Sequence, residues 1–347
     1  MPTQTSGLVL INLGTPDSAD VPQVRRYLKE FLSDPFVIDI PGIARWFLLN
    51  GMILRTRPAK AAAAYRKVFT SRGSPLLFHT EDLTAGLRLR FENPIELGMR
   101  YGNPSIEVAT RKILATGVRQ VVFVPLYPQY SYAASLSSEQ EVKRVQRTLA
   151  TEGLEFGSEI LPDFHLEEGY LRAFEQVTRE ATRDFHPDHY LFSYHGVPVR
   201  QVQRTDLSGG KHCYRETSCC DQPNEANRLC YRAQSIWGAH ALARRLGLSA
   251  EQYSISFQSR LGRTKWVEPY TDHLLGELPG RGVKRLAVVC PSFVADCLET
   301  LEEIAIRGRA QFIAAGGEDL MLVPSLNAHP SWIEAVEKRV RPFLLSR

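Results

Sequence analysis

The stretch that decides the fold is Gly7–Gly14, with the sequence GLVLINLG. It is a short, continuous apolar run that ends in glycine, which is typical of a buried parallel strand that delivers a loop. Similar runs recur with helical segments between them, and this alternation predicts parallel β/α units. Further strands are expected at Arg119–Leu126, His189–His195, Tyr253–Phe257, Arg285–Cys290 and Leu320–Pro324, and helices at Val24–Phe31, Ser105–Thr116, Tyr170–Phe185, Cys230–Arg245 and Cys297–Arg307.

The order of these segments predicts an α/β fold with two Rossmann-like lobes, each a parallel sheet flanked by helices, and a cleft between them. The chain has 347 residues, a length that suits about two domains. We expect the first lobe at residues 1–155 and the second at 156–347. Ligands of such sheets bind beyond the carboxyl ends of the strands, so the loops after the strands are where functional residues are expected.

The composition excludes several classes of protein. With 44% hydrophobic and 23% charged residues, the chain is neither disordered, collagen-like nor a coiled coil. Its net charge of +4 is small and spread along the chain, so nucleic acid is not an expected partner. We see no export signal and no apolar run near the roughly 18 residues of a membrane span, which predicts a cytoplasmic protein.

One histidine ends a predicted strand, and a line of acids follows another. A lone histidine is more often structural than catalytic, but the position of His195 at a carboxyl strand end favours chemistry. If Ser292 caps a helix, Asp296, Glu299 and Glu303 fall within an arc of roughly 60°. Such acids can form a solvated helix face, or they can bind a divalent metal and accept protons together with the histidine.

The segment Phe36–Leu54 is unusually apolar and is followed at once by Arg55, Arg57 and Lys60. It is either a core helix or an exposed lip around a large flat ligand, with a basic edge that touches membrane phosphates. It holds too many large apolar groups for one narrow helix face, so some of them should remain exposed. These groups are Trp46, Phe47, Leu48, Leu49, Met52 and Ile53.

Seven short motifs follow one another along the chain. They are Asn12-Leu-Gly-Thr-Pro16, Gly73-Ser-Pro75, Gly98-Met-Arg-Tyr101, Tyr127-Pro-Gln-Tyr-Ser131, Ser193-Tyr-His-Gly-Val-Pro198, Phe257-Gln-Ser-Arg260 and Phe293-Val-Ala-Asp-Cys-Leu-Glu-Thr-Leu301. In this order they resemble the motifs of ferrochelatases, and the resemblance covers the chain from Gly7 to about Leu326. It implies two Rossmann-like lobes with a porphyrin between them, and a final helix that packs back on the first lobe.

The resemblance also implies an activity and the residues that carry it. The family inserts ferrous iron, a substrate, into a porphyrin late in haem biosynthesis. His195 matches its essential histidine and Glu299 its essential glutamate, both of which handle the Fe²⁺, while Asp296 and Glu303 complete an acidic row for proton relay. Leu13, Arg100, Tyr101, Tyr127, Trp266 and Phe293 match residues that bind the porphyrin.

Several alternatives remain open for the substrate and the assembly. Leu13 and the segment Tyr127–Ser131 resemble the protoporphyrin type, which makes protohaem from protoporphyrin IX in the last step. A coproporphyrin III ferrochelatase and a cobalt or nickel tetrapyrrole chelatase are the alternatives. A tetrapyrrole carrier without chemistry is disfavoured because it leaves His195 and Glu299 unexplained. The protein is expected to be a monomer or homodimer, with a possible peripheral contact at the inner membrane.

Four of the six cysteines, Cys213, Cys219, Cys220 and Cys230, fall within 18 residues. A cytosolic chain of this length does not predict a disulfide framework. Four thiolates are the ligand count of a [2Fe–2S] cluster, and some microbial ferrochelatases resemble this chain in carrying all four in an internal segment. We expect such a cluster, with zinc second and unliganded thiols third. The adjacent pair can serve one cluster only if the backbone turns there.

Overall fold

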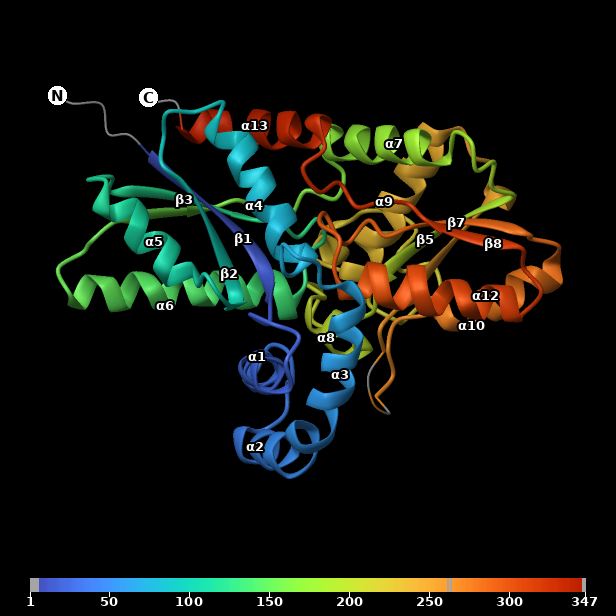
Figure 1. Ribbon diagram of the computed structural model, residues 1–347, viewed down its shortest axis with the longest axis horizontal. Helices are drawn as coiled ribbons and strands as arrows, with labels where there is room; N and C mark the ends of the chain where they lie inside the picture. Colours follow the sequence, from blue (N-terminus) through green and yellow to red (C-terminus); the bar gives the residue numbers. More distant parts are fainter. Residues whose placement is uncertain (1–5, 261, 263, 345–347) are drawn as a thin grey trace. The chain divides into compact units, whose positions relative to one another are not determined.

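The computed structural model describes residues 6–260, 262 and 264–344, and the chain forms two compact units (Figure 1). Unit 1 comprises Met1–Tyr127, Tyr132–Asp163 and Ile333–Arg347, and unit 2 comprises Pro128–Ser131 and Phe164–Trp332. The change from unit 1 to unit 2 at Asp163 comes later than the boundary expected at 155/156.

Unit 1 is built on a four-stranded parallel sheet with the order β2-β1-β3-β4. Its strands are β1 (Ser6–Thr15), β2 (Ile95–Gly102), β3 (Gln120–Pro125) and β4 (Gly157–Ile160). Neither β2 nor β4 was among the strands predicted from the sequence. The reason for β4 is that this strand is a short edge strand, GSEI, with no buried residue, so it lacks the apolar run of a central strand.

Helices cover both faces of this sheet. On one face, α5 (Ile106–Ala115) and α6 (Ser137–Thr151) contribute apolar side chains to a core with β1 and β3. On the other lie α4 (Pro75–Arg88) and α13 (Pro330–Leu344), which approach each other at Gly86 and Ile333 (Figure 1). Gly86 of α4 permits this approach, because a Cβ there would stand 2.6 Å from the Cδ1 atom of Ile333.

A helical group extends from unit 1 beyond the carboxyl end of β1 (Figure 1). It consists of α1 (Val21–Ser33), α2 (Gly42–Leu48), the π-helix η1 (Leu49–Ile53) and α3 (Leu54–Val68). Its own small core is formed by Leu32, Leu49 and Leu54, with Leu28, Phe31, Val37, Ile38 and Ile53 packed against them. The apolar segment of the sequence is therefore folded on α1 and α3.

Unit 2 repeats the plan of unit 1 with the strand order β6-β5-β7-β8, again all parallel. The strands are β5 (His189–His195), β6 (Tyr253–Gln258), β7 (Arg285–Val289) and β8 (Asp319–Leu322). The predicted α/β class, with parallel sheets flanked by helices, is confirmed.

The helices of unit 2 pack on both faces of its sheet. On one face, α7 (Glu168–Thr182) packs against α9 (Tyr231–Leu246). On the other, α10 (Thr271–Glu277), the 3₁₀-helix η5 (Leu278–Arg281), the π-helix η6 (Leu301–Gly308) and α12 (Arg309–Ala314) supply the apolar core over β5 and β7.

Shorter elements complete the chain: α8 (Val199–Arg204), α11 (Leu298–Thr300), the π-helix η2 (Tyr132–Leu136), and the 3₁₀-helices η3 (Glu225–Asn227) and η4 (Ala250–Gln252). Across the part of the chain that the structure describes, no helix has both the length and the apolar composition that a membrane crossing requires.

Candidate active site

His195 is the last residue of β5, and its ring orientation is fixed by its neighbours. Its Nδ1 atom lies 2.6 Å from the carbonyl oxygen of Gly196. Because a carbonyl oxygen can only accept, Nδ1 carries the hydrogen and the Nε2 atom of the neutral ring keeps its lone pair. The His195 main-chain N–H donates to Ser292 Oγ at 3.0 Å. The ring is thus held with Nε2 as the atom that can accept a proton.

Two aromatic side chains of the predicted site lie beside this histidine. The Phe293 ring meets the His195 ring edge-on, with 6.1 Å between centroids. Trp266 forms an isolated bridge with Pro198, and its ring lies 3.3 Å from where a Cβ of Gly196 would stand. Both side chains are half-buried, so each keeps part of its surface available for an apolar ligand.

The acidic helix begins later than the sequence predicted. Ser292 does not cap it, because Pro291–Cys297 forms a turn and the helix starts at Leu298. It then continues as the π-helix η6. π-Helices are rare in proteins, and those that occur often lie at functional sites. Glu299 and Glu303 lie on this helix, whereas Asp296 precedes it, so the predicted arc of three acids is wrong.

The carboxylate of Asp296 is occupied within its own loop. It accepts hydrogen bonds from Thr300 Oγ1 at 3.0 Å and Asn327 Nδ2 at 2.8 Å, and the Ser325 N–H also points at it. Only 6% of the residue is exposed. These contacts connect the start of the helix to the loop after β8, so they give Asp296 a structural role. They do not support the predicted role of Asp296 in proton relay.

Glu303 belongs to the same electrostatic cluster as His195 and Glu299. Burial raises the pKa of Glu303; hydrogen bonds from Ser259 and the charge of His195 oppose the rise, and the charge of Glu299 adds to it. Ser259 donates through its N–H at 2.9 Å and through Oγ at 2.5 Å. A carboxylate with a raised pKa near a histidine is a candidate for proton exchange near neutral pH.

The remaining predicted substrate residues lie in unit 1, at the carboxyl ends of its strands. Leu13, near the end of β1, is half-buried. Tyr127 follows β3, and its hydroxyl pairs with Ser138 Oγ at 3.2 Å. Both keep part of their side chain exposed, as a binding residue requires.

Arg100 and Tyr101 of β2 bond to a carboxylate that was not predicted from the sequence, that of Asp34. Asp34 accepts from Arg100 Nη2 at 2.5 Å, from the Tyr101 hydroxyl at 2.8 Å and from Ser137 Oγ at 2.6 Å. Tyr101 is only 1% exposed, so in this conformation it supports Arg100 rather than presenting a surface to a ligand. No sequence signal marked Asp34, which lies far from β2 along the chain.

The apolar segment leaves several large side chains exposed, as predicted. Ile43 is 78% exposed, Trp46 59%, Phe47 63% and Met52 62%. Leu49, in contrast, is buried in the core of the helical group. We call the exposed set, Ile43, Trp46, Phe47 and Met52, the lip. Arg55, Arg57 and Lys60 at the start of α3 are also exposed.

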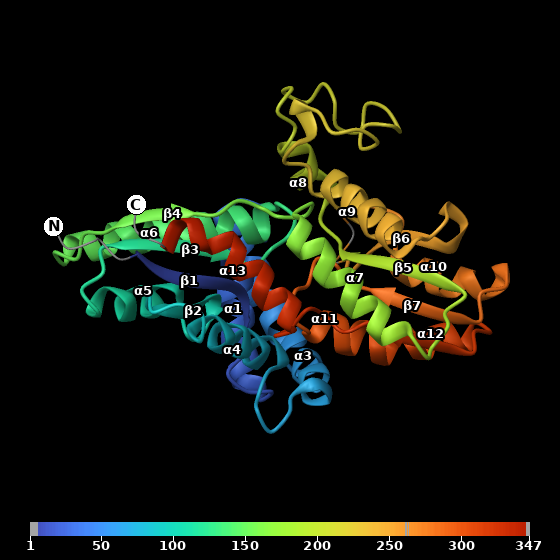
Figure 2. The ribbon, with the colours of Figure 1, turned by 90° about the horizontal axis from the view of Figure 1, so that it is seen from above.

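The cysteine segment lies between α8 and α9 and projects from the sheet of unit 2 (Figure 2). Its four cysteines are buried and free of disulfides. The expected turn is present, since the Asp221 N–H donates to Ser218 O at 2.9 Å. It turns both neighbouring thiols the same way, and Cys219 Sγ lies 3.8 Å from Cys220 Sγ.

The other two thiols lie near this pair. A hydrogen bond with Cys213, with burial adding to it, raises the pKa of Cys230 to about 12. A hydrogen bond with Cys230, followed by burial, raises the pKa of Cys220, while Arg232 opposes the rise. Arg232 donates to Cys220 Sγ at 3.1 Å. The four sulfurs thus approach one another pairwise in a buried place.

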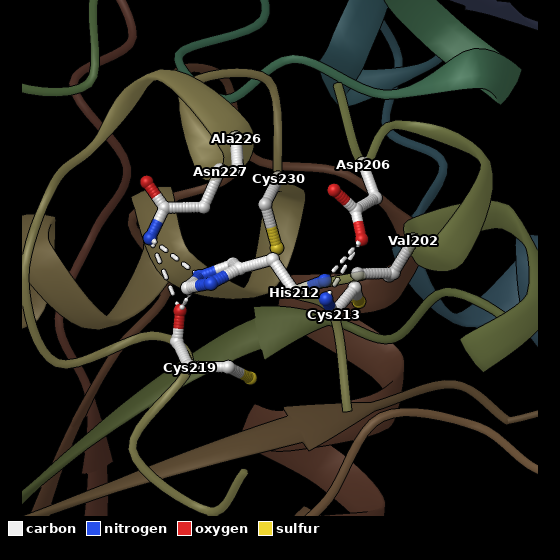
Figure 3. Close-up of a pocket in the computed structure, with 8 residues that line it drawn as sticks. All are labelled: Val202, Asp206, His212, Cys213, Cys219, Ala226, Asn227 and Cys230. Carbon is white, nitrogen blue, oxygen red and sulfur yellow. Dashed lines mark hydrogen bonds between the residues drawn. The ribbon is translucent and has the colours of Figure 1, made fainter. Parts of the chain in front are cut away.

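Main-chain contacts hold this segment in shape (Figure 3). The carboxylate of Asp206 accepts from the N–H groups of His212 and Cys213, and His212 Nε2 lies 2.7 Å from Cys219 O. The cavity that these residues line with Cys230 encloses only about 10 Å³. Within the described residues, no three His, Cys, Asp or Glu side chains converge as closely as one metal ion requires.

Comparisons with known proteins agree with the fold and the motifs. The family model described as Ferrochelatase matches residues 5–343. A curated ferrochelatase of Coxiella burnetii is 44% identical over 97% of this chain and 94% of its own. One of Pseudomonas aeruginosa is 46% identical over 95% and 96%, and one of Azotobacter vinelandii 46% over 96% and 98%.

A solved structure shares the fold at low identity. The sirohydrochlorin chelatase SirB of Bacillus subtilis subspecies spizizenii, in complex with cobalt, superposes with a TM-score of 0.54 at 11% identity, covering 98% of this chain and 95% of its own. By its match to the family model along nearly its whole length and its identity to curated relatives, the chain belongs to the ferrochelatase family.

Proposed function

We propose that this protein is a metal-insertion enzyme, a lyase, that inserts ferrous iron into protoporphyrin IX to form protohaem in haem biosynthesis. The observation that carries the proposal is the cluster of His195, Glu299 and Glu303, which lies beside the half-buried Phe293 in a member of the ferrochelatase family. It combines proton acceptors with an apolar ring at the carboxyl ends of parallel strands.

The reaction requires bases rather than a redox partner. Fe²⁺ enters the ring as both pyrrole protons leave, and the iron keeps its oxidation state. His195 accepts a proton at Nε2, since its Nδ1–H is committed to Gly196 O. Glu303, whose pKa burial raises, can accept and release a proton, and Glu299 carries the second carboxylate of the cluster.

The preference for protoporphyrin rests on unit 1. Leu13 offers an apolar side chain near the end of β1, and Tyr127 lies at the end of β3 with its hydroxyl paired to Ser138. Protoporphyrin carries two vinyl groups where coproporphyrin carries propionates, so apolar contacts favour the former.

A turnover assay tests this function. Purified protein, Fe²⁺ without air and either protoporphyrin IX or coproporphyrin III are mixed, and the loss of free-porphyrin fluorescence is followed. We expect repeated turnover with protoporphyrin. Faster turnover with coproporphyrin would identify a coproporphyrin ferrochelatase. A preference for cobalt with an open tetrapyrrole would identify a different chelatase, and a stop after one equivalent would indicate a carrier.

We also propose that the lip rests on an anionic membrane surface. Its four exposed apolar side chains adjoin Arg55, Arg57 and Lys60, and basic residues near apolar ones favour attachment to acidic headgroups. A poorly soluble porphyrin would then reach the protein without crossing water.

Vesicle co-sedimentation tests this contact. Phosphatidylcholine vesicles with phosphatidylserine should bind the protein weakly and in a salt-sensitive way, and the double substitution Trp46→Ser and Phe47→Ser should remove binding. Leu89→Ser is the matched control, because Leu89 is 90% exposed in unit 1 outside the lip. Equal binding by both variants would overturn the contact.

For the cysteine segment we propose a [2Fe–2S] cluster held by Cys213, Cys219, Cys220 and Cys230. The donor set fits, since four buried thiols approach pairwise and Arg232 points at one of them. The pKa values of Cys219, Cys220 and Cys230 are raised, and metal binding would release such thiol protons to solvent because the positive charge of the metal compensates the thiolates. The cluster would stabilise this segment, and no step of iron insertion involves it.

Absorption and metal content test the cluster. Protein prepared without air should be reddish-brown, with about two irons and about two labile sulfides per chain. Cys219→Ser should remove the colour. Cys290→Ser should not, because Cys290 is a buried residue directly after β7, outside the cysteine segment. Colourless protein with stoichiometric zinc would replace the cluster by a zinc site, and colourless metal-free protein with four titratable thiols would exclude both.

A further inference from the structure

Gln258 ends β6 directly beside His195, its partner in the strand register. The residue is only 3% exposed, and both its main chain and its side chain are hydrogen-bonded. The mechanism above assigns it no step.

The main chain of Gln258 fixes the loop that holds the histidine ring. Its carbonyl accepts the Gly196 N–H at 2.7 Å, and the Gly196 carbonyl in turn accepts from His195 Nδ1. A Cβ on Gly196 would stand 2.7 Å from the Gln258 carbonyl oxygen. This approach needs a glycine, so the spacing between β6 and the histidine loop is tightly defined.

The side chain of Gln258 reaches the glutamate helix. Its Nε2 donates to the main-chain carbonyl of Glu299 at 2.8 Å, and its Oε1 accepts from Ser193 Oγ at 2.7 Å. Ser193 is itself paired with Thr271 Oγ1 at 2.9 Å. Because one neighbour is a carbonyl, which only accepts, the amide can stand in one orientation only.

We propose that Gln258 is a positioning residue for metal insertion, which sets the distance between the His195 ring and the Glu299 carboxylate by bonding to the main chain on both sides. This inference rests on the proposed function. Gln258 bonds to the histidine loop through its main-chain carbonyl and to the glutamate helix through its side chain. A side-chain substitution keeps the first bond and removes the second, so Glu299 is displaced relative to a histidine that stays in place. Misplacement by about 1 Å costs roughly 100-fold in rate when reacting groups must be aligned.

Kinetics of three variants test the proposal. Gln258→Met keeps the shape and removes the side-chain hydrogen bonds, including those to Ser193 and Glu299. Gln258→Glu keeps the acceptor for Ser193 and removes the donor to Glu299. Ser193→Ala removes only the hydroxyl that donates to Gln258. We expect both Gln258 variants to lose about 10- to 100-fold in kcat, with the KM for protoporphyrin within about threefold of the parent. Ser193→Ala should lose less, and its effect should not add to that of Gln258→Met.

Gln146 provides a matched control in unit 1. Its Nε2 also donates to a main-chain carbonyl, that of Phe156 at 2.9 Å, and its Oε1 also accepts from a serine, Ser158 Oγ at 3.3 Å. Gln146→Met should lower the thermal midpoint without a change in kcat, which separates loss of stability from loss of position.

The outcomes distinguish this inference from the function on which it rests. An inactive parent protein would overturn the proposed function and the inference with it. An active parent whose Gln258→Met variant keeps kcat within about twofold would overturn the inference alone. Should that variant fail to fold, unchanged kcat in both Gln258→Glu and Ser193→Ala would do the same.

Discussion

The two sheets have the same strand order, yet a buried carboxylate of unit 1 and a partly buried one of unit 2 stand in different environments. In unit 1, Asp34 accepts from the guanidinium of Arg100 and from two hydroxyls. In unit 2, Glu303 accepts from Ser259, and its basic neighbours are His195 and, at 3.9 Å, the more exposed Arg307. The same fold therefore holds one carboxylate in a tight ion pair and another in a cluster of titratable groups.

The neighbours of an acid in the interior decide whether it stabilises the fold or takes part in proton transfer. A carboxylate bonded to an always-charged guanidinium and to two hydroxyls is held in place by these partners. A carboxylate whose pKa burial raises, beside a histidine and a second glutamate, can exchange a proton. The first arrangement stabilises a fold, and the second suits a reaction that releases protons.

The largest effect should come from the histidine of the titratable cluster. His195→Ala removes the Nε2 acceptor, and we expect metal insertion to fall by at least about 100-fold while porphyrin binding and the circular dichroism spectrum stay normal. The measurement is initial rate with Fe²⁺ and protoporphyrin. Near-normal turnover would mean that unit 2 holds no catalytic cluster.

The two glutamates should differ in their contribution. Glu299→Gln keeps the size and removes the charge, so we expect a loss of about 100-fold in kcat, and Glu303→Gln, one turn further out, should lose about tenfold. Both rates are compared with the parent at one pH. Small and equal losses would instead describe acids on a solvated helix face.

The ion pair of unit 1 should matter for stability. Asp34→Asn leaves Arg100 uncompensated, with its side chain only 15% exposed, and breaking a buried pair costs about 3–5 kcal/mol in free energy of unfolding. Urea denaturation measures it. Asp82→Asn, in the exposed pair with Arg72, is the control and should change stability little. Equal losses of stability in Asp34→Asn and Asp82→Asn would contradict the expected difference between a buried and an exposed ion pair.

The smallest effect should be a shift in pH dependence. Ser259→Ala removes one donor to the Glu303 carboxylate, so the raised pKa of Glu303 should rise further. A base works only when deprotonated, so the acidic limb of the rate profile should move to higher pH, by less than about one unit. A shift to lower pH would contradict this role for Ser259. The profile of kcat/KM between acidic and neutral pH decides it.

Local sequence was enough to identify most of the scaffold. Apolar runs identified the central strands β1, β3, β5 and β7, because a strand buried on both faces is apolar throughout. The edge strands β6 and β8 were also predicted, although they are only partly buried. The position of His195 followed from its place at the end of such a run. The exposure of Trp46 and Phe47 also followed, since one helix face cannot bury so many large side chains.

Tertiary structure alone decided which polar groups meet. Asp34 bonds to Arg100 and Tyr101 across more than sixty residues of chain, and Gln258 reaches Glu299 across 41. Asp296 does not lie on the helix with Glu299 and Glu303, because donors of loop 325–327 hold its carboxylate before the helix begins. Residue spacing encodes which side of an element is apolar, whereas a hydrogen bond depends on positions that only the packed chain defines.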